Sequence, residues 1–357
     1  MSEPGVPVKL AAMIRISPGG AAAAAEQARA YEDAGVDVLA VAESYGADAV
    51  SALGFLAGQT RRAELMAQIL PVYSRTPALT AMTAVGLDIV SQGRFILGLG
   101  VSGPQVIEGW HGLPYDAPLG RTREVIEICR QVWRRERLSH SGSHYQVPLP
   151  PGAGAGVGKA LKIIDTPVRP AIPVFVAALG PANVELTARV ANGWVPFLYI
   201  PELAEKVWGE PLARGLADRP DDLGPLQIMA GGPMAIGPDV THLRDLDRGH
   251  LALYVGGMGA RGRNFYNRLV GRYGFAAEAA QVQDLYLAGR REEAAAALPD
   301  ALLEGTSLIG DDEYITRRLA AYAASGVTVL QIDPVGGDRI GDVRRLRALM
   351  DPMTAPH

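Results

Sequence analysis

Two glycine-containing turns are the residues of this sequence best suited to hold an anionic ligand. Gly100 and Gly103 follow the apolar run 95–99, and residues 178–183 lie between the apolar run 172–177 and a helical pattern. Glycine lets backbone amides approach a ligand closely, and the free amides and dipole of a helix N-terminus attract phosphate. The two turns together therefore predict a phosphate site. The alternative, that both are ordinary connections between strand and helix, stays open.

Four ionisable residues follow predicted strands and could move a proton: Glu43, Tyr45, Glu108 and His111. Glu43 directly follows a buried apolar run, so it either binds a ligand or pairs with a neighbouring cation. His111 lies in an aromatic loop and could equally be packed there. The six histidines show no metal-ligand spacing, and the sequence has no nucleophile elbow and no Walker loop. We therefore expect no metal site and no simple hydrolase.

The order of apolar runs and helical patterns predicts the elements that position these residues. Apolar runs predict eight strands, at residues 8–14, 36–42, 65–70, 95–99, 172–177, 194–198, 226–236 and 328–332. Ser17 and Pro18 predict the start of the first helix. Further helical patterns cover residues 78–91, 122–134, 183–191 and 312–324.

Strands that alternate with helices form a parallel sheet, and eight repeats predict an α/β fold of the (β/α)8 TIM-barrel type. The alternative, an open doubly wound sheet, lacks its expected Gly-x-Gly-x-x-Gly turn after the first strand. We expect one domain over residues 1–357, with insertions at about 137–170, after strand four, and about 238–305, after strand seven. Sites in such barrels lie on the loops at the carboxyl ends of the strands.

Composition and charge exclude several classes of partner. A net charge of −4 gives no electrostatic reason to expect nucleic acid or an anionic membrane. The single cysteine, Cys129, rules out an internal disulfide. The N-terminus lacks a signal-peptide pattern, and no apolar run is long enough to span a bilayer, so we expect a cytoplasmic protein that acts on small molecules.

Six segments, in this order and spacing, resemble the luciferase-like superfamily of flavin and deazaflavin oxidoreductases. They are YEDAGVDVLAVAE (31–43), QILPVYSRTP (68–77), LDIVSQGRFILGLGVSG (87–103), LSHSGSHYQV (138–147), IPVFVAALGPANVELTARVANGW (172–194) and GVTVLQIDP (326–334). The actinobacterial branch that uses coenzyme F420 is the most similar. The resemblance implies a barrel that is usually a homodimer, with a deazaflavin standing at its mouth.

The resemblance also implies which residues bind the cofactor. The phosphate would meet the turns at Ser102, Gly103, Leu179, Gly180, Ala182 and Asn183. Members of the superfamily carry a non-prolyl cis peptide bond at the end of the third strand, which here corresponds to Gln68–Ile69, followed by Leu70. That bond would face the ring, and Glu43 would contact the ring edge.

The function implied is hydride transfer between F420 and a small, hydrophobic organic substrate with a C=C, C=O or C=N bond. An FMN-dependent monooxygenase on the same barrel is the first alternative, and a non-catalytic flavin-binding barrel is the second. Aromatic residues near the rim could line a substrate site or simply pack: Trp110, Tyr115, Phe197 and Tyr199. Arg261 and Arg263 could meet the acidic tail of the cofactor or face solvent.

Overall fold

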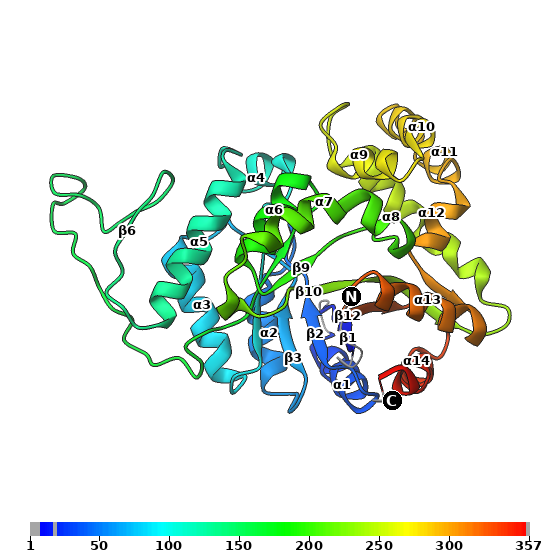
Figure 1. The fold of residues 1–357 in the computed structure, drawn as a ribbon, viewed down its shortest axis with the longest axis horizontal. Helices are drawn as coiled ribbons and strands as arrows, with labels where there is room; N and C mark the ends of the chain where they lie inside the picture. The colour runs from blue at the N-terminus through cyan, green and yellow to red at the C-terminus, as the bar shows by residue number, and fades with distance from the viewer. Residues whose placement is uncertain (1–7, 17–19, 355–357) are drawn as a thin grey trace.

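The computed structural model describes residues 8–16 and 20–354, with side chains up to Asp351, and it confirms the predicted barrel (Figure 1). Eight parallel strands form a closed ring, because the last strand pairs with the first and the sixth with the seventh. In chain order they are β1 (Lys9–Met13), β2 (Val38–Val41), β3 (Glu64–Ala67), β5 (Phe95–Gly100), β8 (Val174–Ala177), β9 (Gly193–Val195), β10 (Gln227–Ile236) and β12 (Val329–Pro334).

Helices cover the outside of the ring, as Figure 1 shows. They are α1 (Ala21–Asp33), α2 (Ala49–Ala57), α3 (Pro77–Val90), α5 (Pro118–Trp133), α6 (Pro181–Val190), α7 (Ala204–Ala217), α13 (Asp312–Ala324) and α14 (Arg339–Thr354). The predicted helix start at Ser17 and Pro18 lies outside the described residues. The sequence patterns did not single out α2, α7, α14 or the short strand β11 (Leu308–Gly310), which pairs with β10.

The barrel has an apolar layer on each face of its strands, which is why the strands read as nearly continuous apolar runs. Side chains at every second position fill the interior; they are Ala11, Val38, Ala40, Met66, Ile96, Phe175, Val195, Met229 and Val329. The alternate positions pack against the surrounding helices and form the larger core. Among the described residues, no helix is both long and apolar enough to cross a bilayer.

Both predicted insertions are present. The first contains the hairpin β6 (His140–Ser141) and β7 (Gln146–Val147), and its remaining chain extends away from the barrel, on the left of Figure 1. The second lies beyond β10, at the upper right of Figure 1, and is mainly helical. Its helices are η3 (Thr241–Asp247), α8 (Arg248–Ala252), the π-helix η4 (Leu253–Gly257), α9 (Phe265–Arg272), α10 (Ala276–Leu287), α11 (Arg291–Ala296) and α12 (Asp300–Gly305).

A buried carboxylate on α5 holds the hairpin of the first insertion in place. Glu124 accepts hydrogen bonds from the amides of Ser143 and Tyr145, both at 2.9 Å, and its Oε2 lies 3.2 Å from Nε2 of His140. Burial alone would raise the pKa of Glu124. The hydrogen bonds from His140 and from the hairpin amides outweigh burial and hold the pKa below its ordinary value of 4.5.

This lowered pKa predicts an acid-sensitive part of the stability. A carboxylate with a lowered pKa in the folded state stabilises the fold above pH 4.5, and this contribution is lost as the pH falls through the folded-state pKa. We expect Glu124→Gln to lower the free energy of unfolding by about 1–3 kcal/mol at neutral pH, because hydrogen bonds to a charged group are lost. Urea unfolding at pH 7 and at pH 3–4 measures this. If the difference in the free energy of unfolding between wild type and Glu124→Gln does not become smaller in acid, the lowered pKa of Glu124 is contradicted.

Candidate active site at the carboxyl ends of the strands

The third strand is interrupted at the point where the sequence placed a glutamine in an apolar run. β3 ends at Ala67, pairing resumes at β4 (Leu70–Pro71), and the peptide bond between Gln68 and Ile69 is cis, as the resemblance implied. Gln68 lies two residues beyond the interior residue Met66, and its Nε2 donates to Oε1 of Gln331 at 2.7 Å. Its own Oε1 is buried without a hydrogen-bond partner in the described chain. A polar pair therefore lies directly above the apolar interior of the barrel.

Two glycines of β5 provide room for this interruption. A Cβ atom on Gly98 would lie 1.9 Å from the carbonyl oxygen of Ala67, and one on Gly100 would lie 2.6 Å from Cδ1 of Ile69. From sequence alone, Gly100 is predicted to let a ligand approach. The structure shows instead that the missing side chain accommodates the neighbouring strand, whereas the space around Gly103 is open.

Glu43 is held by a buried ion pair. Its carboxylate accepts two hydrogen bonds from the guanidinium of Arg75, at 2.5 and 2.9 Å, and one from the amide of Ala49 at 3.0 Å. The side chains of Glu43 and Arg75 are 8% and 14% exposed. Of the two interpretations of Glu43, the structure shows pairing with a cation. The pair connects the loop after β2 to the loop after β4, so it fixes two parts of the rim relative to each other.

The turn before α6 presents free backbone amides at the rim. Among the described residues, the amides of Leu179, Gly180 and Ala182 have no hydrogen-bond acceptor, while the amide of Asn183 donates to Gly180 O at 3.0 Å. Gly180 is the N-cap and supplies no side-chain cap, and a Cβ there would meet no atom within 4 Å. The Oδ1 of Asn183 is buried and has no hydrogen-bond partner in the part of the chain that the structure describes. The first turn of α6 thus keeps unsatisfied donors that can bind an anion.

Two buried tryptophans orient this turn. The indole N–H of Trp194 donates to Ala178 O at 2.9 Å, and that of Trp208 donates to Leu179 O at 3.2 Å. In a planar trans peptide the N–H points opposite to the C=O. Because both carbonyls point toward the tryptophans, the amides of Leu179 and Gly180 point away from them.

The loop after β5 carries the other predicted residues. It begins with Ser102, which has a positive φ of 53°, and Gly103 is the N-cap of α4 (Pro104–Gly109). Glu108 is exposed, and its Oε1 accepts from the amide of Tyr115 at 3.3 Å. His111 follows, and its Nε2 is buried without a hydrogen-bond partner in the described chain.

Tyr45 approaches this loop from the neighbouring part of the rim. Its ring centroid lies 6.5 Å from that of Trp110, the residue that precedes His111. More than half of its surface is exposed. The structure therefore brings three of the four predicted ionisable residues, Tyr45, Glu108 and His111, to one region, whereas Glu43 is occupied by Arg75.

Aromatic residues of the second insertion lie beside Phe197, which follows β9. The centroid of Phe197 is 4.7 Å from that of Tyr254 and 5.6 Å from that of Tyr266. Burial raises the pKa of Tyr254 and of Tyr266, so both hydroxyls stay protonated and can donate hydrogen bonds. Tyr199 is different: it stacks on Trp208 at 5.4 Å and is 2% exposed, so it packs the core and does not line a site.

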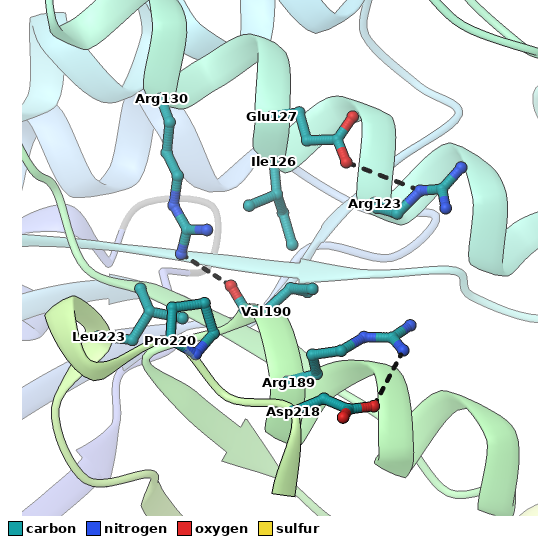
Figure 2. A pocket seen from close by; sticks show the side chains of 9 residues that line it. All are labelled: Arg123, Ile126, Glu127, Arg130, Arg189, Val190, Asp218, Pro220 and Leu223. Carbon is teal, nitrogen blue, oxygen red and sulfur yellow. Dashed lines mark hydrogen bonds and ion pairs between the residues drawn. The ribbon is translucent and has the colours of Figure 1, made fainter. Parts of the chain in front are cut away.

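Two cavities of the described chain differ in position and charge. The larger, about 420 Å³, is lined by residues 123–130 of α5, by the last turn of α6 and by residues 218–223 after α7, so it lies at the end of α6 opposite to the rim (Figure 2). Its arginines have partners: Arg123 lies 3.7 Å from Glu127, Arg189 lies 3.9 Å from Asp218, and Arg130 donates to the carbonyl of Val190 at the end of α6.

The smaller cavity, about 280 Å³, lies at the rim between the turn before α6 and α9.

A model of the luciferase-like monooxygenase family matches residues 6–329 of the sequence. This chain belongs to that family. A protein of Mycobacterium tuberculosis with the provisional name coenzyme F420-dependent oxidoreductase is 39% identical to this family member over 326 residues, which is 90% of this chain and 93% of the relative. A 5,10-methylenetetrahydromethanopterin reductase of Archaeoglobus fulgidus is 25% identical over 86% of this chain and 88% of its own length.

Solved structures confirm the fold of this family member. The F420-dependent tetrahydromethanopterin reductase of Methanopyrus kandleri superposes with a TM-score of 0.78, at 20% sequence identity, over 98% of this chain and 100% of its own. At this identity the likeness concerns the fold alone.

Several residues that shape this rim are not indicated by the sequence patterns. Gln331 is at an inward position two residues beyond Val329, so a polar residue in step with the interior period was the available signal. Arg75 lies in the quoted QILPVYSRTP segment, but its partner could not be read from sequence. Tyr254 and Tyr266 lie in the second insertion, where no periodic pattern related them to Phe197.

Proposed function

We propose that this protein is a coenzyme F420-dependent oxidoreductase that transfers a hydride between the deazaflavin and a small, hydrophobic organic substrate. The observation that carries the proposal is the open N-terminus of α6, whose amides face away from Trp194 and Trp208 at the rim of a luciferase-like barrel. The 39% identity to a relative named for F420 supports the choice of cofactor.

Three buried polar atoms without partners fit a cofactor at this rim. They are Oε1 of Gln68, Nε2 of His111 and Oδ1 of Asn183, at the carboxyl ends of three neighbouring strands of the barrel. A buried polar atom that lacks a hydrogen bond is costly, and a bound ligand can satisfy it. The amides of Leu179, Gly180 and Ala182 would hold the phosphate, with Ser102 and Gly103 nearby. Gln68, Ile69 and the backbone of Leu70 would contact the ring, and Glu43 would position this part of the rim through Arg75.

When bound, the deazaflavin supplies a carrier that gives or takes two electrons as a hydride. The protein then has to orient the substrate and transfer one proton. Phe197, Tyr254 and Tyr266 offer apolar faces and neutral hydroxyl donors, which suit an organic substrate with a C=C, C=O or C=N bond. Among the ionisable candidates we assign the proton transfer to His111. Its buried Nε2 has no hydrogen-bond partner among the described residues, whereas Glu108 and Tyr45 are exposed to solvent.

This assignment predicts the effect of removing the imidazole. We expect His111→Gln to lower kcat by about 10²-fold, the lower end of general acid–base effects. Steady-state oxidation of reduced F420 by a panel of ketones, enones and cyclic imines measures kcat. Tyr45→Phe and Glu108→Gln are the matched controls, with little change expected. If either control loses turnover while His111→Gln turns over normally, the proton transfer belongs to the residue changed in that control.

Titration with the cofactor tests the function directly. We expect the purified protein to bind oxidised F420 at micromolar concentration, followed by the change in deazaflavin fluorescence. FMN serves as the competing ligand. No binding of F420, or preferential binding of FMN with oxygen consumed in turnover, would contradict the proposal and favour a flavin monooxygenase.

We also propose that the protein is a homodimer. Leu79, Met82, Ile89 and Val90 recur at helical spacing on α3 and are exposed, and Phe55 of α2, a helix that packs against α3, is exposed too. A contiguous exposed apolar face of this kind marks an interaction surface. Sedimentation should give twice the mass of the chain, and a monomer at all concentrations would contradict this.

Cys129 is a free, buried thiol and no disulfide stabilises the chain, which supports the cytoplasm as its location.

A further inference from the structure

The cavity at the rim carries positive charge without compensation. Its walls are the turn at Leu179 and Gly180 on one side and α9 on the other, from which Arg268 and Arg272 point to it. None of the residues that line it, all within the described part of the chain, is acidic. The larger cavity of Figure 2 differs, because two of its three arginines, Arg123 and Arg189, are matched by Glu127 and Asp218.

The two arginines are four residues apart on one face of α9, so their charges repel each other. They also lie against the N-terminus of α6, the positive end of that helix dipole. Neither forms an ion pair with a carboxylate among the described residues. Arg268 lies over the ring of Phe265 at 4.8 Å, and Arg272 donates to the carbonyl of Val207. An anion in the cavity would relieve this concentration of positive charge.

The apolar part of the lining indicates a chain and not only a point charge. Leu179, Phe265 and Leu269 add apolar surface to a lining that also contains the turn at Gly180 and the two arginines. A ligand with one anionic group at the turn, an apolar linker and further carboxylates beyond it would match this combination. By contrast, Arg261 pairs with Asp284, so it is already neutralised.

We infer that this cavity holds the acidic tail of the cofactor beyond its phosphate, with Arg268 and Arg272 as the partners of the tail carboxylates. The inference rests on the proposed function and adds the residues of the second insertion to its site. It replaces Arg261 and Arg263, the arginines that the sequence suggested for this role.

Binding measurements with cofactor samples that carry few and many tail carboxylates test the inference. The wild-type protein should bind the longer tail more tightly at low salt, and this preference should fade as salt is added. Arg268→Gln should remove this preference. Its affinity for the cofactor with the long tail should be about two- to fivefold lower, as expected for loss of an exposed ion pair. The deazaflavin headgroup without phosphate and tail should bind equally to both proteins. Arg263→Gln, which removes the same charge from an exposed position of the same insertion, is the matched control.

The outcomes separate the two proposals. Failure of the wild-type protein to bind any form of the deazaflavin would overturn the proposed function. Tight binding without dependence on tail length, or an unchanged preference in Arg268→Gln, would overturn this inference alone. Arg268 is the residue to test because its side chain donates no hydrogen bond to any described residue, whereas a change at Arg272 also removes the hydrogen bond to the carbonyl of Val207.

Discussion

Gly180→Asp is expected to weaken the binding of F420 by a factor on the order of 10³ while the protein stays as stable as the wild type or becomes slightly more stable. Like charges placed against each other in a binding site cost several kcal/mol, which corresponds to that factor. The new carboxylate would also accept hydrogen bonds from the amides in the first turn of α6, the same amides that we propose bind the phosphate. The same contact is a good N-cap, worth a few tenths of a kcal/mol over glycine.

The fold should tolerate this change. Gly180 has φ −72° and ψ 145°, which any residue adopts, and a Cβ there meets no atom within 4 Å. Gly180→Ser is the matched control, because it caps the helix without adding charge, and we expect a much smaller loss of affinity. Fluorescence titration gives the affinities and urea unfolding gives the stabilities. Unchanged binding of F420 by Gly180→Asp in a folded protein would show that the phosphate does not lie at α6.

The barrel was predictable because each of its eight strands leaves a local apolar pattern, although α2, α7 and α14 were not singled out. The predicted run 226–236 differs from β10 by one residue, and the predicted helix 312–324 coincides with α13. The third strand was predicted as one run, 65–70, although it breaks at Gln68 and Ile69. Local propensity does not report such a break, because the reason for it lies on the next strand, where Gly98 and Gly100 leave space.

The site was predictable only where a single segment carries it. The turn at Gly180 combines a strand end, a glycine and a helix start within a few residues, so its free amides followed from sequence. Pairs of residues from distant segments could not be predicted in this way. Gln68 and Gln331 are 263 residues apart, and Arg75 and Glu43 are 32 apart. Which partners meet depends on closure of the ring, and no spacing in the sequence encodes it.

The ion pair of Glu43 and Arg75 gives the largest expected effect on stability. Removing one partner of a buried pair leaves the other charge buried without compensation, at a cost of about 3–5 kcal/mol. We therefore expect Glu43→Ala to lower the free energy of unfolding by about that amount, since Arg75 loses both of its hydrogen bonds to Glu43 and the amide of Ala49 loses its acceptor. Urea unfolding monitored by circular dichroism measures the change.

A double-mutant cycle separates the pair from its surroundings. Arg75→Met alone should also destabilise, because the carboxylate of Glu43 then stays buried with only the Ala49 amide. The double variant Glu43→Ala with Arg75→Met should be more stable than the sum of the two single losses predicts, since neither charge is left alone. Strict additivity would mean that the two side chains do not interact in the folded protein. Glu43 would then be free to contact a ligand, and its role as a positioning residue would have to be abandoned.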